Sequence, residues 1–305
     1  VKSMEEDGYS RGFAAGLVCC GAAMSIVIPP SIGLVIYGVI AETSISDLFM
    51  AAIIPGLICG VLMICVLPFG KGGAATQALV PMPYAELPYG PRLWRSFLDS
   101  FWGLMTPAVI LGGIYSGVFT PTEAAIVATV YAALVGALAY RTLSLRGLYE
   151  SLGDAAAGSA VVMLVVAYAA LFGWVVTVDD LIGKYSGALL GLSDNQAVIL
   201  LVIMLILLIA GMFMDAITIM FICLPIFLPV QRALDWDPVW FGVLVMINLA
   251  IGLFTPPVGI NLYVAANVTR QPLERVARGA LPFLLTSLIG LAIVAAFPVL
   301  TALFR

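Results

Sequence analysis

Long runs of apolar residues separated by short polar stretches make up nearly the whole chain. Nine of these runs contain no charged residue, and most reach the length of about 20 residues that a membrane-spanning helix needs. The pattern predicts an all-α polytopic membrane protein. The runs cover residues 12–41, 48–70, 100–122, 124–140, 155–178, 195–214, 216–231, 238–268 and 279–304.

Two of the runs are too long for one straight helix. Residues 12–41 and 238–268 each contain a Pro-Pro pair near the middle, Pro29-Pro30 and Pro256-Pro257. Proline removes a backbone donor and disfavours helical geometry in the residue before it. Each run is therefore predicted to be a broken helix, whose irregular backbone at membrane depth needs protein or a polar cavity around it.

The two broken helices correspond at a fixed spacing. A shift of 227 residues places Pro29-Pro30 on Pro256-Pro257 and Pro55 on Pro282. Matching breaks in two halves indicate the binding site of a secondary transporter. The second half has residues 98–230 before its break, whereas the first has only about ten residues there. We therefore expect a chain that lacks part of its first repeat at the N-terminus.

Positively charged residues suggest how the chain is oriented. Ten of the thirteen Lys and Arg residues fall in loops around residues 2–11, 71–95, 141–146 and 270–278, which the positive-inside rule places in the cytoplasm. Asp194 and Arg232 then both lie outside, so the apolar runs between them must enter the membrane and return. We predict a re-entrant helical hairpin, and two broken helices of opposite orientation that form inverted-topology repeats.

This topology divides the chain into three parts. Residues 1–70 are expected to be the C-terminal part of the first repeat, with the broken helix 12–41 and the helix 48–70. Residues 71–97 form a cytoplasmic connector. Residues 98–305 form the second repeat, with scaffold helices in 98–178, the hairpin 195–231, the broken helix 238–268 and a terminal helix 279–304.

Composition restricts the chemistry. The chain is 63% hydrophobic and only 10% charged, and it has no histidine. These values exclude a soluble enzyme, and the missing histidine excludes Ser-His catalysis and His metal sites. The net charge of −4 gives no basic surface for nucleic acid. We expect no cofactor, no transition metal and no enzymatic activity.

The candidate chemistry lies at the breaks and at the hairpin tip. Asp215 is the one acidic residue deep within an apolar region, where a carboxylate is costly and usually functional, although it could instead cap the helix that starts at Ala216. Thr255 and Asn261 flank the second break and offer oxygen ligands suited to Na⁺, or Thr255 bonds back to its own helix. Ser31 and backbone carbonyls offer the same at the first break. Asn267 is a candidate for a polar substrate path.

A separate motif has a structural interpretation. Thr120-Pro121-Thr122-Glu123 places Thr before Pro, with Glu three residues after the Thr. This spacing is that of a capping box at a helix start.

Four stretches resemble signatures of one family. They are Leu111 to Ala125, Gly211 to Asp215, Ile28 to Gly38 and Leu253 to Leu262. Together they are similar to the large membrane subunit of TRAP (tripartite ATP-independent periplasmic) transporters. The resemblance implies a sodium-coupled, elevator-type importer of organic acids such as C4-dicarboxylates or sialic acid, in a bacterial or archaeal inner membrane. Its expected partners are a small membrane subunit and a periplasmic substrate-binding protein.

The resemblance also implies two sodium sites, each between a hairpin tip and a helix break. One site would use Asp215, Gly252 and Thr255, with the backbone near Pro257 and Gly259. Ser25, Ile28 and Pro30 would form half of the other.

Two other functions stay open, and a third lacks a group that it would need. A sodium/carboxylate symporter of the same superfamily that needs no binding protein would use the same residues. A channel would differ by flux that does not saturate. An aspartyl intramembrane protease would need a second deep carboxylate beside Asp215.

Overall fold

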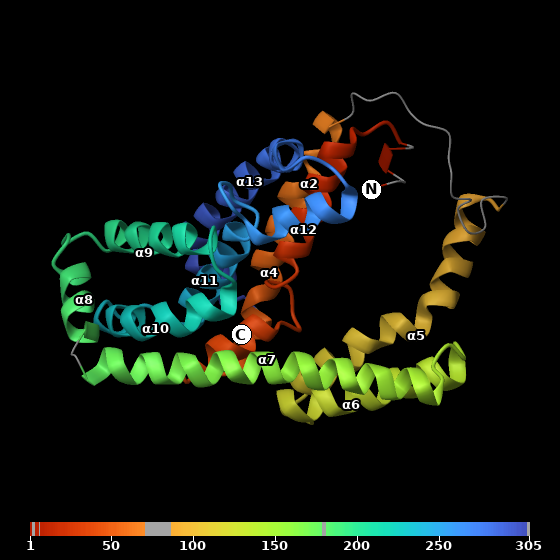
Figure 1. Ribbon diagram of the computed structural model, residues 1–305, viewed down its shortest axis with the longest axis horizontal. Helices are drawn as coiled ribbons and strands as arrows, with labels where there is room; N and C mark the ends of the chain where they lie inside the picture. The colour runs from red at the N-terminus through yellow and green to blue at the C-terminus, as the bar shows by residue number, and fades with distance from the viewer. Residues whose placement is uncertain (2–3, 6, 71–86, 179–180, 304–305) are drawn as a thin grey trace. The chain divides into compact units, whose positions relative to one another are not determined.

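The chain is helical along its described length (Figure 1). The computed structural model describes residues 1, 4–5, 7–70, 87–178 and 181–303, and no β-strand occurs among them. The first helices are α2 (Arg11–Met24), α3 (Ile32–Ile40), α4 (Ile45–Ile64) with the 3₁₀ turn η1 (Leu67–Gly70), α5 (Tyr89–Tyr115), α6 (Pro121–Leu134) with the π-helical turn η2 (Val135–Ala139), and α7 (Leu145–Val178). There follow α8 (Leu181–Leu190), α9 (Gln196–Gly211), α10 (Ala216–Ala233), α11 (Pro238–Gly252), α12 (Ile260–Thr269), α13 (Leu273–Ala296) and the 3₁₀ turn η3 (Pro298–Thr301).

Six segments of the described chain are long and apolar enough to cross a membrane. They contain α4, α5, α6, α7, α10 and α13, and α2, α9 and α11 are shorter apolar helices. These helices confirm the predicted all-α polytopic membrane protein. The predicted bounds differ most at α5, which begins at Tyr89 rather than near residue 100, because Arg92, Arg95 and Asp99 are accommodated in the helix.

Contacts divide the chain into two compact units. One unit contains residues 1–77 and 166–305, and the other contains residues 78–165. The first unit holds both Pro-Pro breaks and the helices α9 and α10. The predicted division into two repeats and a connector stays a prediction. Residues 71–86 of the predicted connector 71–97 lie outside the described residues, as does Lys2.

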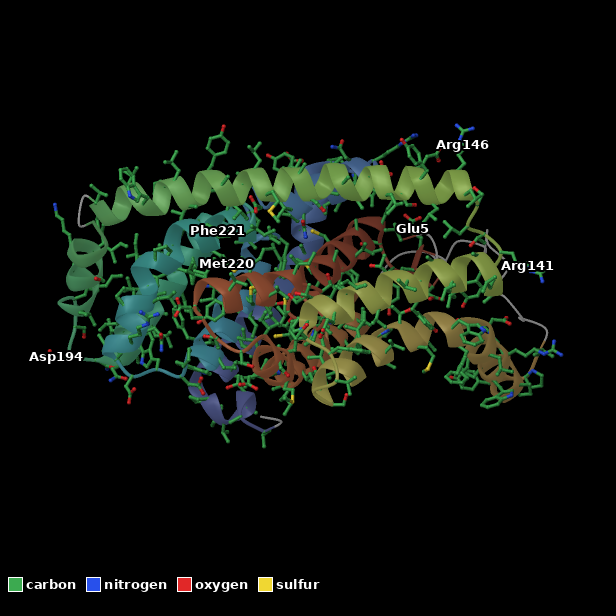
Figure 2. The ribbon with its side chains drawn as sticks, turned by 90° about the horizontal axis from the view of Figure 1, so that it is seen from below. Glu5, Arg141, Arg146, Asp194, Met220 and Phe221 are labelled. Carbon is green, nitrogen blue, oxygen red and sulfur yellow. The ribbon has the colours of Figure 1, made fainter. Side chains whose placement is uncertain are left out.

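Local capping signals start several helices as expected. At α6, the Thr120 side chain accepts a hydrogen bond from the Glu123 backbone, and a Glu123 carboxylate oxygen accepts one from the Thr120 backbone at 2.8 Å. The predicted capping box is therefore confirmed. In the same unit, Arg141 and Arg146 lie at the α6–α7 corner, where Arg146 pairs with Glu150 at 2.9 Å (Figure 2).

Helices α2 and α13 cross in backbone contact in the first unit. A Cβ atom added to Gly279 would lie 2.1 Å from the Gly12 carbonyl oxygen, and one added to Gly16 would lie 2.4 Å from the Gly279 carbonyl carbon. Small residues let helices approach this closely in membranes, where lipid is as apolar as the helices and packing drives association. The crossing ties the first broken helix to the terminal helix.

We expect Gly279→Ala to loosen this crossing. The added methyl group meets backbone atoms that no rotamer change can move, and overpacking of this kind costs about 1–3 kcal/mol. The purified variant should therefore show a lower melting temperature in detergent. Gly60→Ala is the matched control, because a Cβ at that helical position meets no atom within 4 Å. Equal melting temperatures for the two variants would contradict the close crossing.

Candidate ion site at the hairpin tip and helix breaks

Each predicted broken helix is two helices separated by a short irregular segment. Residues 25–31 separate α2 from α3, and residues 253–259 separate α11 from α12. Both Pro-Pro peptide bonds are cis. Subtracting 227 from the residue numbers of α11 and α12 gives 11–25 and 33–42, which are close to the observed bounds of α2 and α3. The opposite orientation of the two halves in a membrane stays a prediction.

Helices α9 and α10 form a hairpin with Asp215 at its tip. The two helices run back from the tip as the two arms of the hairpin (Figure 1), and Asp194 lies in the turn before α9, at the end of the hairpin away from the tip (Figure 2). Asp215 is the N-cap of α10: one carboxylate oxygen accepts from the Thr218 backbone N–H at 3.0 Å, and the other accepts from the Thr218 hydroxyl at 2.5 Å. The capping role that the sequence suggested is confirmed. Asp215 lies on the surface of the described chain.

The hairpin tip is joined directly to the second break. A Cβ atom added to Gly252 would lie 2.7 Å from the Gly211 Cα atom, and the Gly259 backbone N–H donates to the Met212 carbonyl at 2.8 Å. Gly211 ends α9 and Gly252 ends α11, so two helix C-termini meet. Each carries a partial negative charge of about half an elementary charge. The junction is therefore a place that favours a cation.

Polar groups of the second break form hydrogen bonds mainly with nearby backbone groups of the break and its two helices. The Thr255 side chain is 6% exposed, and its hydroxyl donates to the Ile251 carbonyl at 2.6 Å, which is the back-bonded alternative of the sequence interpretation. A hydroxyl that donates in this way keeps oxygen lone pairs for a cation. Gly252 accepts from the Thr255 backbone at 3.1 Å, and Leu253 accepts from the Asn261 backbone at 3.0 Å.

Glycine is required at position 259. Its φ of +56° is in the left-handed region, and an added Cβ would lie 3.0 Å from the Thr255 carbonyl oxygen and 3.1 Å from that of Leu253. Both carbonyls therefore face the Gly259 backbone. Pro257, two residues earlier, has no N–H with which to satisfy a carbonyl.

Polar groups of the first break likewise form hydrogen bonds with nearby backbone groups. Ser31 is 5% exposed, caps α3 by accepting from the Leu34 backbone at 3.3 Å, and donates to the Ile26 carbonyl. Ser25 donates to the Ala22 carbonyl at 2.7 Å. Ile28 contacts the position of Gly56 on α4, and both Ile28 and Pro30 are exposed. These residues lie together in the segment between α2 and α3.

The candidate substrate-path residues do not gather at one place. Asn261 lines an open cavity of about 620 Å³ between α12 and α2, together with Cys19, Ala22 and Val264. Ser31 and Asn267 are not among the residues that line it, and Asn267 is exposed near the end of α12. Among the described residues, no three His, Cys, Asp or Glu side chains are placed to hold a metal ion together.

Sequence reasoning missed the groups that join the tip to the break. These are Gly211, the Met212 carbonyl and Asn248, a fully buried amide that donates to the Met204 carbonyl at 2.6 Å and so links α11 to α9. An asparagine inside an otherwise apolar run was the available signal for the last of these. Gly252 was expected at the site from the resemblance, but its contact with Gly211 was not, because that contact joins positions 41 residues apart.

These features define a helical membrane protein with broken helices and a hairpin whose tip contacts one break. Residues 1–300 match the family described as tripartite ATP-independent periplasmic transporter, DctM component. The chain belongs to this family, as the resemblance implied.

Named relatives agree with the family assignment. The chain is 40% identical to the sialic acid TRAP transporter large permease protein SiaM of Vibrio cholerae, over 99% of this chain and 70% of that protein. It is 39% identical to the C4-dicarboxylate TRAP transporter large permease protein DctM of Pseudomonas aeruginosa, over 98% of this chain and 68% of that protein. It is also 36% identical to the 2,3-diketo-L-gulonate TRAP transporter large permease protein YiaN of Escherichia coli, over 93% and 66%.

We expect Gly259→Ala to detach the tip from the break. Alanine in the left-handed region costs about 1–2 kcal/mol, and its methyl group would lie against two carbonyl oxygens. The backbone at position 259 should therefore move, and the hydrogen bond to the Met212 carbonyl should be lost. Hydrogen exchange at the Gly211 to Asp215 tip should then accelerate. Gly117→Ala is the matched control, since Gly117 has a φ of +72° but no atom within 4 Å of an added Cβ. Unchanged exchange at the tip in Gly259→Ala would contradict the proposed contact.

Proposed function

We propose that this chain forms the transport core of a sodium-coupled permease that imports an organic acid across the bacterial inner membrane. The observation that carries the proposal is the meeting of two helix C-termini at Gly211 and Gly252, within a few residues of the Asp215 carboxylate. Helix C-termini and unwound carbonyls are the groups with which broken-helix transporters bind coupling cations. Asp215, Thr255 and the backbone of Gly252, Pro257 and Gly259 are proposed to hold one Na⁺.

The first break is proposed to supply half of a second sodium site. Ser25, Ile28 and Pro30 lie in the segment that ends α2, where the helix again presents its negative end. Inward movement of one Na⁺ across 100 mV releases about 2.3 kcal/mol, which is available to drive uptake. No other cofactor is proposed.

The family assignment supports partners and a substrate class. We infer that the chain works with a small TRAP membrane subunit and with a periplasmic binding protein that delivers the substrate, by an elevator-type movement. The relatives named above are transporters of sialic acid, C4-dicarboxylate and 2,3-diketo-L-gulonate. A carboxylate is common to these compounds, so we propose a carboxylate substrate whose further identity is selected mainly by the binding protein. Asn261, Ser31 and Asn267 are proposed to line its path.

Substitution of Asp215 separates its capping role from its proposed ion-binding role. Asp215→Ser keeps an oxygen at a position where serine caps about as well as aspartate, but it removes the charge. The complete large permease should be reconstituted with its small subunit and binding protein, and uptake of sialic acid, a C4-dicarboxylate and 2,3-diketo-L-gulonate measured under a Na⁺ gradient. We expect Na⁺-dependent uptake to fall at least about tenfold at an unchanged melting temperature, because a contact to a charged group contributes roughly 1.5–3 kcal/mol.

Asp237→Asn is the matched control for this experiment. Asp237 caps α11 by accepting from the Val239 backbone at 2.8 Å and is exposed at the start of that helix, away from the breaks. Its variant should transport normally. Uptake that is equally fast without Na⁺, or in Asp215→Ser, would contradict the sodium site and leave Asp215 as a helix cap.

A further inference from the structure

Three arginines surround one cavity at the end of the first unit where α2 and α13 begin. Arg11, Arg275 and Arg278 line a cavity of about 580 Å³, a volume typical of small-ligand sites. Phe13 and Phe69 supply apolar walls, and Ser10 a hydroxyl. No acidic residue is among those that line it within the described chain.

The close crossing of α2 and α13 brings the three arginines to one cavity. Gly12 and Gly279 bring the two backbones into contact, and the Arg275 stem lies on Gly12, with its Cγ atom 2.8 Å from an added Cβ. Like charges that line one cavity repel each other, and an anion between them would relieve this repulsion. The arrangement is therefore suited to a negatively charged ligand.

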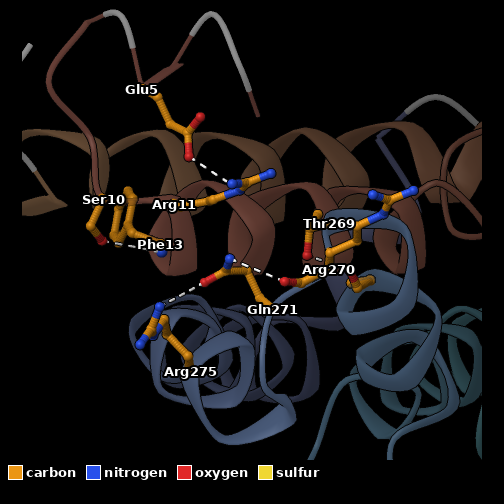
Figure 3. Close-up of polar contacts among 9 residues, drawn as sticks. Glu5, Ser10, Arg11, Phe13, Thr269, Arg270, Gln271 and Arg275 are labelled. Atoms are coloured by element: carbon orange, nitrogen blue, oxygen red, sulfur yellow. Dashed lines mark hydrogen bonds and ion pairs between the residues drawn. The ribbon is translucent and has the colours of Figure 1, made fainter. Parts of the chain in front are cut away.

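The partners of the arginines leave most of their donors available. Arg11 pairs with Glu5 at 3.3 Å, and Arg275 donates to Gln271 at 3.0 Å (Figure 3). Neither Arg275 nor Arg278 forms an ion pair within the part of the chain that the structure describes, and Glu274 does not line the cavity. A guanidinium has five N–H donors in a fork that matches phosphate oxygens.

The cavity borders the ends of two candidate membrane spans. Gly70 is the last residue of the candidate span Ile45–Gly70, and Arg275 and Arg278 lie in the first turns of the candidate span Leu273–Ala296. The sequence places this end of both spans on the cytoplasmic side. Basic pockets between helices at that surface suit the head groups of anionic lipids.

We propose that this cavity binds the phosphate group of an anionic phospholipid, with the head group on Arg11, Arg275 and Arg278 and the start of an acyl chain against Phe13 and Phe69. The site is distinct from the proposed sodium site and does not depend on it. A bound lipid would neutralise the arginine cluster and hold α2 against α13 at the membrane surface.

Lipid titration of the complete large permease in a neutral detergent tests the proposal. Binding of dioctanoyl phosphatidylglycerol, dioctanoyl phosphatidylcholine and glycerol 3-phosphate should be measured by native mass spectrometry. We expect phosphatidylglycerol to bind preferentially. Its affinity should fall roughly fivefold in Arg278→Gln and about 25-fold in the double variant Arg275→Gln/Arg278→Gln, since each arginine near the surface contributes about a factor of five. Glutamine at position 275 keeps the Cγ atom that packs against Gly12, so the variant should preserve the helix crossing.

Two further variants complete the design. Arg141→Gln/Arg146→Gln removes the same charge at exposed positions of the other unit and should leave the affinity unchanged. Arg278→Lys keeps the charge and should retain most of the binding. If the two double variants lost the same affinity for phosphatidylglycerol, the lipid would be attracted by the overall charge of the protein and not by this cavity, and the proposal would be wrong. If glycerol 3-phosphate bound as tightly as phosphatidylglycerol, the ligand would be a soluble phosphate and the lipid proposal would be wrong. If phosphatidylcholine bound as tightly, the net negative charge of the lipid would not be what the site recognises, and the proposal would again be wrong.

Discussion

The contact between Gly211 and Gly252 is the constraint on which the rest of the candidate ion site depends. It brings the C-terminus of a hairpin helix against the C-terminus of a broken helix, with no side chain between them. The Gly259–Met212 hydrogen bond and the Asn248–Met204 hydrogen bond then fix the tip and the body of the hairpin on α11. A larger residue at either glycine would separate the two helix ends and disperse the negative potential that they create together.

Glycine contacts also organise a second helix crossing in the same unit. Gly12, Gly16 and Gly279 bring α2 and α13 to backbone contact, as Gly211 and Gly252 do for α9 and α11. In water, burial of large apolar side chains at such crossings would stabilise the fold. In lipid this stabilisation is small, and close packing between small residues contributes instead. At these two crossings glycine brings the backbones together, whereas elsewhere in the unit large side chains such as Phe241, Phe254 and Phe283 are fully buried between the helices.

Local features of the site follow from the sequence, whereas its long-range contacts do not. The Pro-Pro pairs identify both breaks, and the Thr120–Glu123 and Asp215 caps follow from residue type and spacing, because each depends on neighbours within a few positions. The back-bond of Thr255 was one of two sequence alternatives. The meeting of Gly211 with Gly252 and that of Gly12 with Gly279 could not be predicted, because glycine in an apolar run has many causes and only the fold selects the partner. Likewise, nothing in Arg275 and Arg278 alone shows that Arg11 lies beside them.

Asp215 stands between helix ends of opposite sign. It neutralises the positive N-terminus of α10, which carries about half a charge, and it lies four residues from the junction of two negative C-termini. By the same approximation, the tip with Asp215 ionised carries a net charge of about −1.5, and without the carboxylate about −0.5. One Na⁺ would then leave the tip with a net charge of about −0.5 with Asp215 present and about +0.5 without it, so only the ionised carboxylate makes the whole charge of the cation favourable there. A single carboxylate can thus cap a helix and set the affinity for a monovalent cation, because both effects come from the same charge at the same helix end.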